Sequence, residues 1–160
     1  MKKIITNLFT SILLISIIGS SCGSSNDNTK QSSDATKTSI AEVFDVPLLI
    51  GKNIDDVRKI LGKPTDKEQE PTKKQMKINF DIWDNSFKKN NRTLLVTFNT
   101  QNRKVIDFFI DTTDSSGASS DYSDLLQICN VSNENDKYSI VPVPSLKDNT
   151  KFTGIKIVAK

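Results

Sequence analysis

Residue types that support nucleophilic or acid–base catalysis are sparse in this chain. It contains no histidine, which excludes the Ser-His-Asp and Cys-His arrangements and most catalytic zinc sites. Ser86 and Lys89 match the S-x-x-K spacing of acyl-serine enzymes. The companion motifs of those enzymes are absent, and so is a glycine-rich phosphate loop. We therefore interpret residues 86–89 as a solvated loop.

Carboxylates offer a second possible chemistry. Asp107 and Asp111 fall on one side of a predicted strand, and Asp114 follows just beyond it. Four strand residues span about 13 Å, which is too far for a paired catalytic acid and base. The D-x-D-x-D-G spacing of a calcium loop is also missing. The sequence therefore predicts a polar strand face, and a non-enzymatic protein with no metal or cofactor.

Cys22 is the residue whose surroundings predict a definite modification. It follows a positive start (Met1-Lys2-Lys3), an apolar run and the small residues 19–21. This order is typical of a secretory signal peptide, and the apolar run is too short and interrupted to span a bilayer. Residues 18–22 resemble the lipobox of bacterial lipoproteins. That resemblance implies cleavage before Cys22, a diacylglyceryl thioether on its sulfur and a palmitate-type acyl chain on its amine. Ordinary signal-peptide cleavage is the alternative.

A lipidated Cys22 would anchor the exported chain to a membrane, since two or more acyl chains suffice for stable binding. Gly23 stands where an aspartate is associated with inner-membrane retention, so the outer membrane is favoured, on its periplasmic side or at the surface. Residues 23–38 offer almost nothing to bury and are predicted to stay disordered. The expected organisation is a signal peptide (1–21), the lipidated cysteine with a tether spanning roughly 20–24 Å (22–40), and one domain (41–160).

Charge and the second cysteine limit the remaining possibilities. Removing residues 1–21 takes away two lysines and no acid, so the net charge falls from +3 to +1 (20 basic minus 19 acidic residues). A nearly neutral chain gives no electrostatic reason to expect nucleic-acid binding. Cys129 lies in an apolar helical pattern and is expected to be a small buried side chain rather than a reactive thiol.

The pattern of apolar residues predicts the elements of the domain. Asn53 is a helix N-cap, and Gly62 and Pro64 end the same helix; Ile54, Val57, Ile60 and Leu61 share its inward face. Alternation predicts a strand over 76–82, a polar connection over 84–91, and strands over 94–98 and 105–110 with Ile106, Phe108 and Ile110 inward. A second helix (120–130) and two strands (138–143 and 152–158) follow. The predicted fold class is α+β, with helices on one face of an antiparallel sheet in the order helix, three-strand meander, helix, two strands.

Residues 51–64, with Gly51, Val57, Leu61, Gly62 and Pro64 at their expected places, resemble the helix signature of the SmpA/OmlA (BamE-type) family of small outer-membrane lipoproteins. The resemblance covers about residues 47–111. It implies a compact helix-plus-three-strand unit that supports the assembly of outer-membrane barrels through protein contacts. Residues 112–160 have no counterpart in that family, and no partner-binding residue is transferred.

Three aromatic residues are candidates for an interaction surface. Trp83 and Phe109 fall opposite the alternation assigned to the core, and Phe87 lies in the predicted polar connection. Exposed aromatics dominate the energetics of protein interfaces. Residues 112–160 could instead fold over that face, which we favour because the second helix also needs a sheet to pack on. The function predicted is a lipid-anchored, protein-binding module of the cell envelope. The alternative is a lipoprotein that binds a small molecule or cell-wall fragment in a cleft between sheet and second helix.

Overall fold

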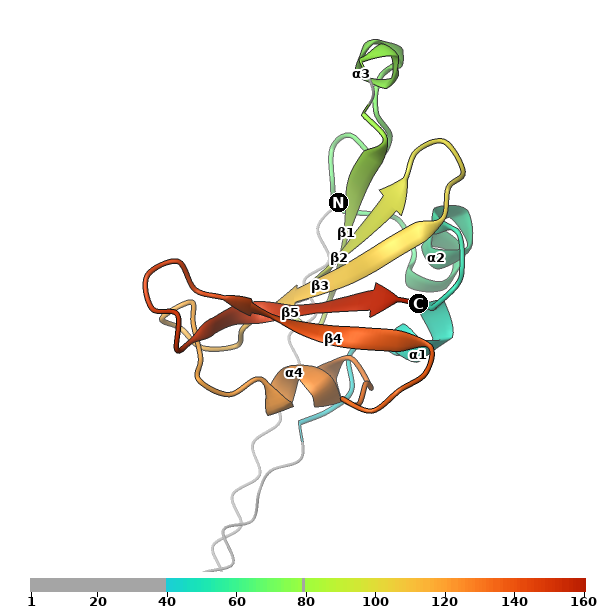
Figure 1. The fold of residues 1–160 in the computed structure, drawn as a ribbon. Coiled ribbons are helices and arrows are strands. Elements are labelled where there is room, and N and C mark those ends of the chain that lie inside the picture. Colours follow the sequence, from blue (N-terminus) through green and yellow to red (C-terminus); the bar gives the residue numbers. More distant parts are fainter. Residues whose placement is uncertain (1–39, 79) are drawn as a thin grey trace, which may run out of the picture. The chain divides into compact units, whose positions relative to one another are not determined.

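The computed structural model describes residues 40–78 and 80–160, which lie within one compact unit (Figure 1). The elements in chain order are α1 (Val46–Leu49), α2 (Ile54–Leu61), α3 (Lys73–Lys77), β1 (Ile82–Lys89), β2 (Arg92–Asn99), β3 (Val105–Asp111), α4 (Ser123–Ile128), β4 (Tyr138–Pro144) and β5 (Phe152–Ala159). The predicted signal peptide, Cys22 and the tether up to residue 39 lie outside the described residues. Within 40–78 and 80–160, no helix has the length and apolar character needed to cross a membrane.

The strands form one antiparallel sheet in the order β1-β2-β3-β5-β4. The predicted meander is formed by β1, β2 and β3. Asn90 and Asn91 connect the first two strands with φ angles of 48° and 58°, the positive values that a two-residue type I′ hairpin turn requires. β5 pairs with β3, which leaves β4 at the edge although it precedes β5 in the chain. The predicted α+β class is confirmed.

Helices α1, α2 and α4 lie on one face of this sheet (Figure 1). α2 begins where the sequence predicts, because the Asn53 side chain accepts a hydrogen bond of 2.9 Å from the Asp56 N–H, and it ends at Gly62 with φ 89°. Ile54 and Val57 are buried beneath it, whereas Ile60, predicted to point inward, is exposed. The largest fully buried core side chains are Phe44, Leu49, Ile54, Phe87, Leu94, Phe98, Phe108, Ile110, Ile128, Ile155 and Ile157.

The predicted strand over residues 76–82 is wrong, and so is the polar connection over 84–91. Thr72 and Gln75 form a capping box that starts the short helix α3, and the first strand begins only at Ile82. The alternation of Met76, Ile78, Phe80 and Ile82 has the pattern of a half-buried strand, which is why the strand was predicted too early. In the structure these four side chains are exposed and pack on no core. The true strand carries the polar sequence Asp84-Asn85-Ser86, and its pairing with β2 outweighs that low strand propensity.

Ile106 is a second correction. Val105 pairs with Phe98 and Asp107 pairs with Thr97, so Ile106 is an extra residue in β3 without its own partner in β2. Such a β-bulge reverses the alternation on one side of it. Val105, Phe108 and Ile110 therefore point into the core, and Ile106 points to the opposite face, where it lines a groove with Asp107 and Phe109. Cys129 is buried as predicted, and burial raises the pKa of its thiol to about 12.

Candidate interaction surface

The face of the sheet opposite the helices, here called the open face, is crossed by two rows of side chains. One row consists of the direct cross-strand partners Ser86, Leu95, Phe109, Lys156 and Val141. The next consists of Asp84, Thr97, Asp107, Val158 and Ser139. No described helix lies on this face (Figure 1). A groove of about 450 Å³ runs over it, lined by Ile82, Asp84, Leu95, Thr97, Ile106, Asp107, Phe109, Val143 and Lys156.

Asp107 is the buried charge at the centre of this groove. Its residue exposure is only 7%, and Lys156 donates a hydrogen bond of 3.2 Å from Nζ to Oδ2. The other carboxylate oxygen, Oδ1, is buried and has no hydrogen-bond partner among the described residues. A buried oxygen left unpaired is costly. The open face therefore holds an acceptor that a donor from another molecule could satisfy.

Phe109 is held in place beside this carboxylate by a glycine. A Cβ atom on Gly154 would lie 2.7 and 2.8 Å from two atoms of the Phe109 ring, and it would also clash with the carbonyl oxygen of Ile110. The ring therefore lies directly over the Gly154 backbone, in space that a side chain would otherwise occupy. Phe109 is half-buried in this position.

The three aromatic residues singled out in the sequence do not form one surface. Phe87 is 2% exposed and belongs to the core. Trp83 pairs with the core residue Phe98, so it lies on the helix-covered side, where its indole N–H donates to the Glu68 carbonyl at 3.4 Å. Only Phe109 lies on the open face. Residues 112–160 do not cover that face, since α4 packs into the core beneath the sheet and β4 and β5 extend the sheet sideways.

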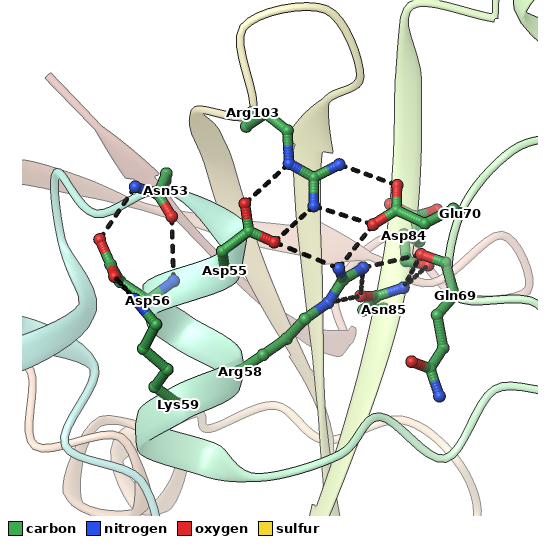
Figure 2. A network of polar contacts seen from close by, with 10 residues as sticks. All are labelled: Asn53, Asp55, Asp56, Arg58, Lys59, Gln69, Glu70, Asp84, Asn85 and Arg103. Atoms are coloured by element: carbon green, nitrogen blue, oxygen red, sulfur yellow. Dashed lines mark hydrogen bonds and ion pairs between the residues drawn. The ribbon is translucent and has the colours of Figure 1, made fainter.

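A polar network on the covered side joins α2 to the sheet (Figure 2). Arg58 donates to the Oδ1 atom of Asn85 from Nε at 2.9 Å and from Nη2 at 2.6 Å. Arg103, in the β2–β3 turn, donates to both carboxylate oxygens of Asp55 at 2.9 and 2.6 Å. Glu70 lies between the two guanidinium groups and accepts from both. Sequence analysis missed this network, because its members lie up to 48 positions apart.

The two arginines of the network neutralise the charges of Asp55 and Glu70. The hydrogen bond from Arg103 is the main cause that lowers the pKa of Asp55 and of Glu70, and the same two acids raise the pKa of Arg103. Each guanidinium carbon also lies 5.6 Å from the centre of the Phe98 ring. Paired arginines and carboxylates of this kind fix the position of a loop, and we assign the network to holding residues 69–70 and the β2–β3 turn against α2.

The residues considered for catalysis are not brought together. Ser86 is a strand residue and not part of a loop, and its N–H and hydroxyl are bound to the Asp66 carboxylate at 2.5 and 2.9 Å. Lys89, three residues on, points to the other face of β1 because strand side chains alternate. Asp114 caps its own turn by accepting from the Ser116 N–H at 2.8 Å. In the described part of the chain, no group of three histidine, cysteine or acidic residues could hold a metal ion.

Comparison of the chain with models of known families, with characterised proteins and with solved structures finds no match. The resemblance of residues 51–64 to the SmpA/OmlA family therefore stays a prediction, and the open face has to be interpreted from its own chemistry.

Proposed function

We propose that this chain is a lipid-anchored protein of the cell envelope that binds another protein through the open face of its sheet. The observation that carries this proposal is the combination, on one face that no described helix covers, of apolar side chains with a buried carboxylate whose Oδ1 atom has no hydrogen-bond partner among the described residues. The anchor itself follows from the prediction for Cys22.

The edges of the sheet are poor sites for a partner strand, which directs attention to the open face. At the β1 edge, the Thr65 N–H donates to the Ser86 carbonyl at 2.8 Å, and Asp66 accepts from the Ser86 N–H. At the other edge, β4 contains Pro142 and Pro144, which have no N–H to donate. Blocked edges prevent addition of a further strand, so a partner is expected to dock side chains on the open face.

The chemistry of the face defines the partner surface. A partner must place apolar groups against the apolar side chains of the groove, which are Leu95, Ile106, Phe109 and Val143. It must also offer a hydrogen-bond donor to Asp107. A lysine, arginine or backbone N–H that reached Oδ1 would satisfy a buried oxygen inside an apolar surround. Such a desolvated, charge-assisted contact is a typical binding hot spot.

In-cell photo-cross-linking tests the proposal. A photoreactive amino acid at Thr97, on the open face, is expected to capture the same partner protein repeatedly, and Asp107→Asn is expected to weaken that capture. The same amino acid at Gln127, exposed on α4, is the matched control and is expected to capture nothing in common. A Cys22→Ala variant shows whether capture needs the anchor. Absence of a recurrent partner at position 97 would overturn the proposal.

A second candidate function is small-molecule or cell-wall-fragment binding. It is favoured by a hollow of about 560 Å³ beside α4, whose lining includes Leu126, Asn130 and Tyr138. A thermal-shift screen of muropeptides and other envelope metabolites distinguishes the two functions. Stabilisation that is lost on Asn130→Ala and kept on Asp107→Asn would support ligand binding.

A further inference from the structure

The segment leading into β1 exposes an unusual concentration of large apolar side chains. Met76, Ile78, Phe80 and Ile82 are 39%, 66%, 44% and 54% exposed. These four account for half of the eight large hydrophobic side chains that are exposed in the described part of the chain. Contiguous exposed apolar surface on a protein marks an interaction site. We call residues 72–78 and 80–82 the arm.

The arm has a defined structure although it contributes nothing to the core. α3 buries none of its residues and stands apart from the sheet beyond the start of β1 (Figure 1). Its base is fixed, because the Thr100 hydroxyl donates to the Phe80 carbonyl at 2.8 Å and the Thr100 N–H donates to the Asp81 carbonyl at 2.9 Å. The Phe80 ring meets Trp83 edge-on, with 6.3 Å between the centroids.

The charge of the arm indicates what it binds. α3 carries Lys73, Lys74 and Lys77 and no acid, and Asp81 is the one acid between positions 72 and 82. Lysines beside exposed aliphatic and aromatic side chains are the composition of segments that lie in a membrane interface, and tryptophan favours the same depth. Docking of two arms in two copies would bring six lysines together, so self-association is disfavoured by repulsion.

We propose that the arm docks on an anionic bilayer surface, with the lysines at the lipid headgroups and with Ile78 and Phe80 among the upper acyl segments. The arm borders the open face at Ile82, which also lines the groove, but docking through its lysines, Ile78 and Phe80 does not depend on the partner proposed above. Together with an anchor on Cys22, it would give the domain two independent attachments to the same membrane.

Trp83 is the chain's only tryptophan, which provides a direct readout. The full chain is reconstituted in vesicles of phosphatidylglycerol and phosphatidylcholine in equal parts, and in vesicles of phosphatidylcholine alone, each with brominated acyl chains. Quenching of Trp83 is measured on the vesicle-bound fraction in both cases, so that it reports docking of the arm and not the amount of bound protein. We expect strong quenching in the anionic vesicles and weak quenching in the neutral ones.

Two sets of variants test the roles of the side chains. Replacing Lys73, Lys74 and Lys77 by glutamine is expected to lower the docking equilibrium constant on the order of 100-fold. The matched control replaces three exposed lysines outside the arm by glutamine, at Lys104, Lys137 and Lys147. This variant is expected to leave the docking equilibrium constant unchanged. Ile78→Ser with Phe80→Ser is expected to abolish quenching.

Three results would overturn the proposal. The first is quenching that is absent in anionic vesicles, and the second is quenching that is equal in the arm variant and the control variant. The third is a blue shift of Trp83 that grows with the density of protein on the vesicle without quenching by bromine, which would assign the arm to contacts between copies.

Discussion

Arg58 on α2 and Asn85 on β1 are joined by two hydrogen bonds to a single amide oxygen, at 2.9 and 2.6 Å. Asn85 is completely buried, and its amide nitrogen donates to the carbonyls of Gln69 and Asp84 at 3.0 and 2.9 Å. The side chain thus connects a helix, a loop and a strand from inside the fold. A polar residue on the core face of β1 is satisfied in full, as buried polar groups must be.

Asn85→Ala is expected to lower the free energy of unfolding by about 2–3 kcal/mol, because it removes two buried hydrogen bonds from Arg58 and one each to the Gln69 and Asp84 carbonyls. Urea denaturation measures the effect. Asn133→Ala, at an exposed position, is the control and should change stability by less than about 0.5 kcal/mol. Equal effects of the two substitutions would contradict the role assigned to Asn85.

Stability should fall in acid partly through Asp55 and Glu70. Their pKa values are lowered in the folded state, chiefly by Arg103, so the unfolded chain binds protons first as the pH falls. The stabilisation is therefore complete above the unfolded values, near pH 4–5, and is lost as the pH drops through the folded values. In Arg103→Gln the free energy of unfolding, measured by urea titration at pH values from 6 to 2, is expected to fall less steeply as the pH decreases. Both carboxylates are partly exposed, so added salt should shrink the effect.

Arg92→Gln is the control for that measurement, since the ion pairs of Asp55 and Glu70 do not include Arg92. Its free energy of unfolding should fall with decreasing pH as that of the unsubstituted protein does. If the free energy of unfolding of Arg103→Gln falls just as steeply, groups other than Asp55 and Glu70 control stability in acid.

Gly154→Ala is expected to cost about 2–3 kcal/mol, because the new methyl group overlaps the Phe109 ring and the Ile110 carbonyl. In a Phe109→Ala background the same substitution should cost less, since only the carbonyl still obstructs it. Thermal or urea unfolding of the four proteins gives the coupling between the two positions. A coupling of zero would mean that the ring does not lie over Gly154.

Lys156→Met is expected to destabilise the protein by about 1–2 kcal/mol, because it leaves the buried Asp107 carboxylate without its counter-charge. Asp107→Asn in the same chain should restore most of that loss. Asp107→Asn alone should leave stability nearly unchanged, and this is why its effect on cross-linking reports binding and not folding. A large loss from Asp107→Asn alone would identify the carboxylate as a structural element.

Helix caps and apolar alternation predicted an element correctly where its position depends on residues within that element. Asn53 and Gly62 mark both ends of α2 by their own chemistry, and the alternation predicted for residues 94–98 coincides with real burial in β2. β1 could not be located in this way, because the buried Asn85 finds its hydrogen-bond partners Arg58 and Gln69 at positions 27 and 16 residues earlier. The apolar alternation of the arm is indistinguishable in sequence from that of a half-buried strand, and only the structure shows it to be exposed.

The candidate surface was predicted less well than the fold. Phe109 was assigned to the face opposite the core, where the structure places it, but Phe87 and Trp83 were grouped with it through a misplaced strand. Asp107 was noticed for its charge, whereas its burial depends on Lys156 in a strand 49 positions away. The bulge at Ile106 depends on the register with β2, and no pattern within β3 reveals it.

The order β1-β2-β3-β5-β4 has a consequence for how the chain is made. Among the described strands β4 has no neighbour other than β5, so residues 138–144 cannot join the sheet until residues 152–159 have been synthesised. Until then, β3 presents an unpaired edge. A nascent or stalled chain that lacks residues 152–159 would therefore be open to aggregation and proteolysis.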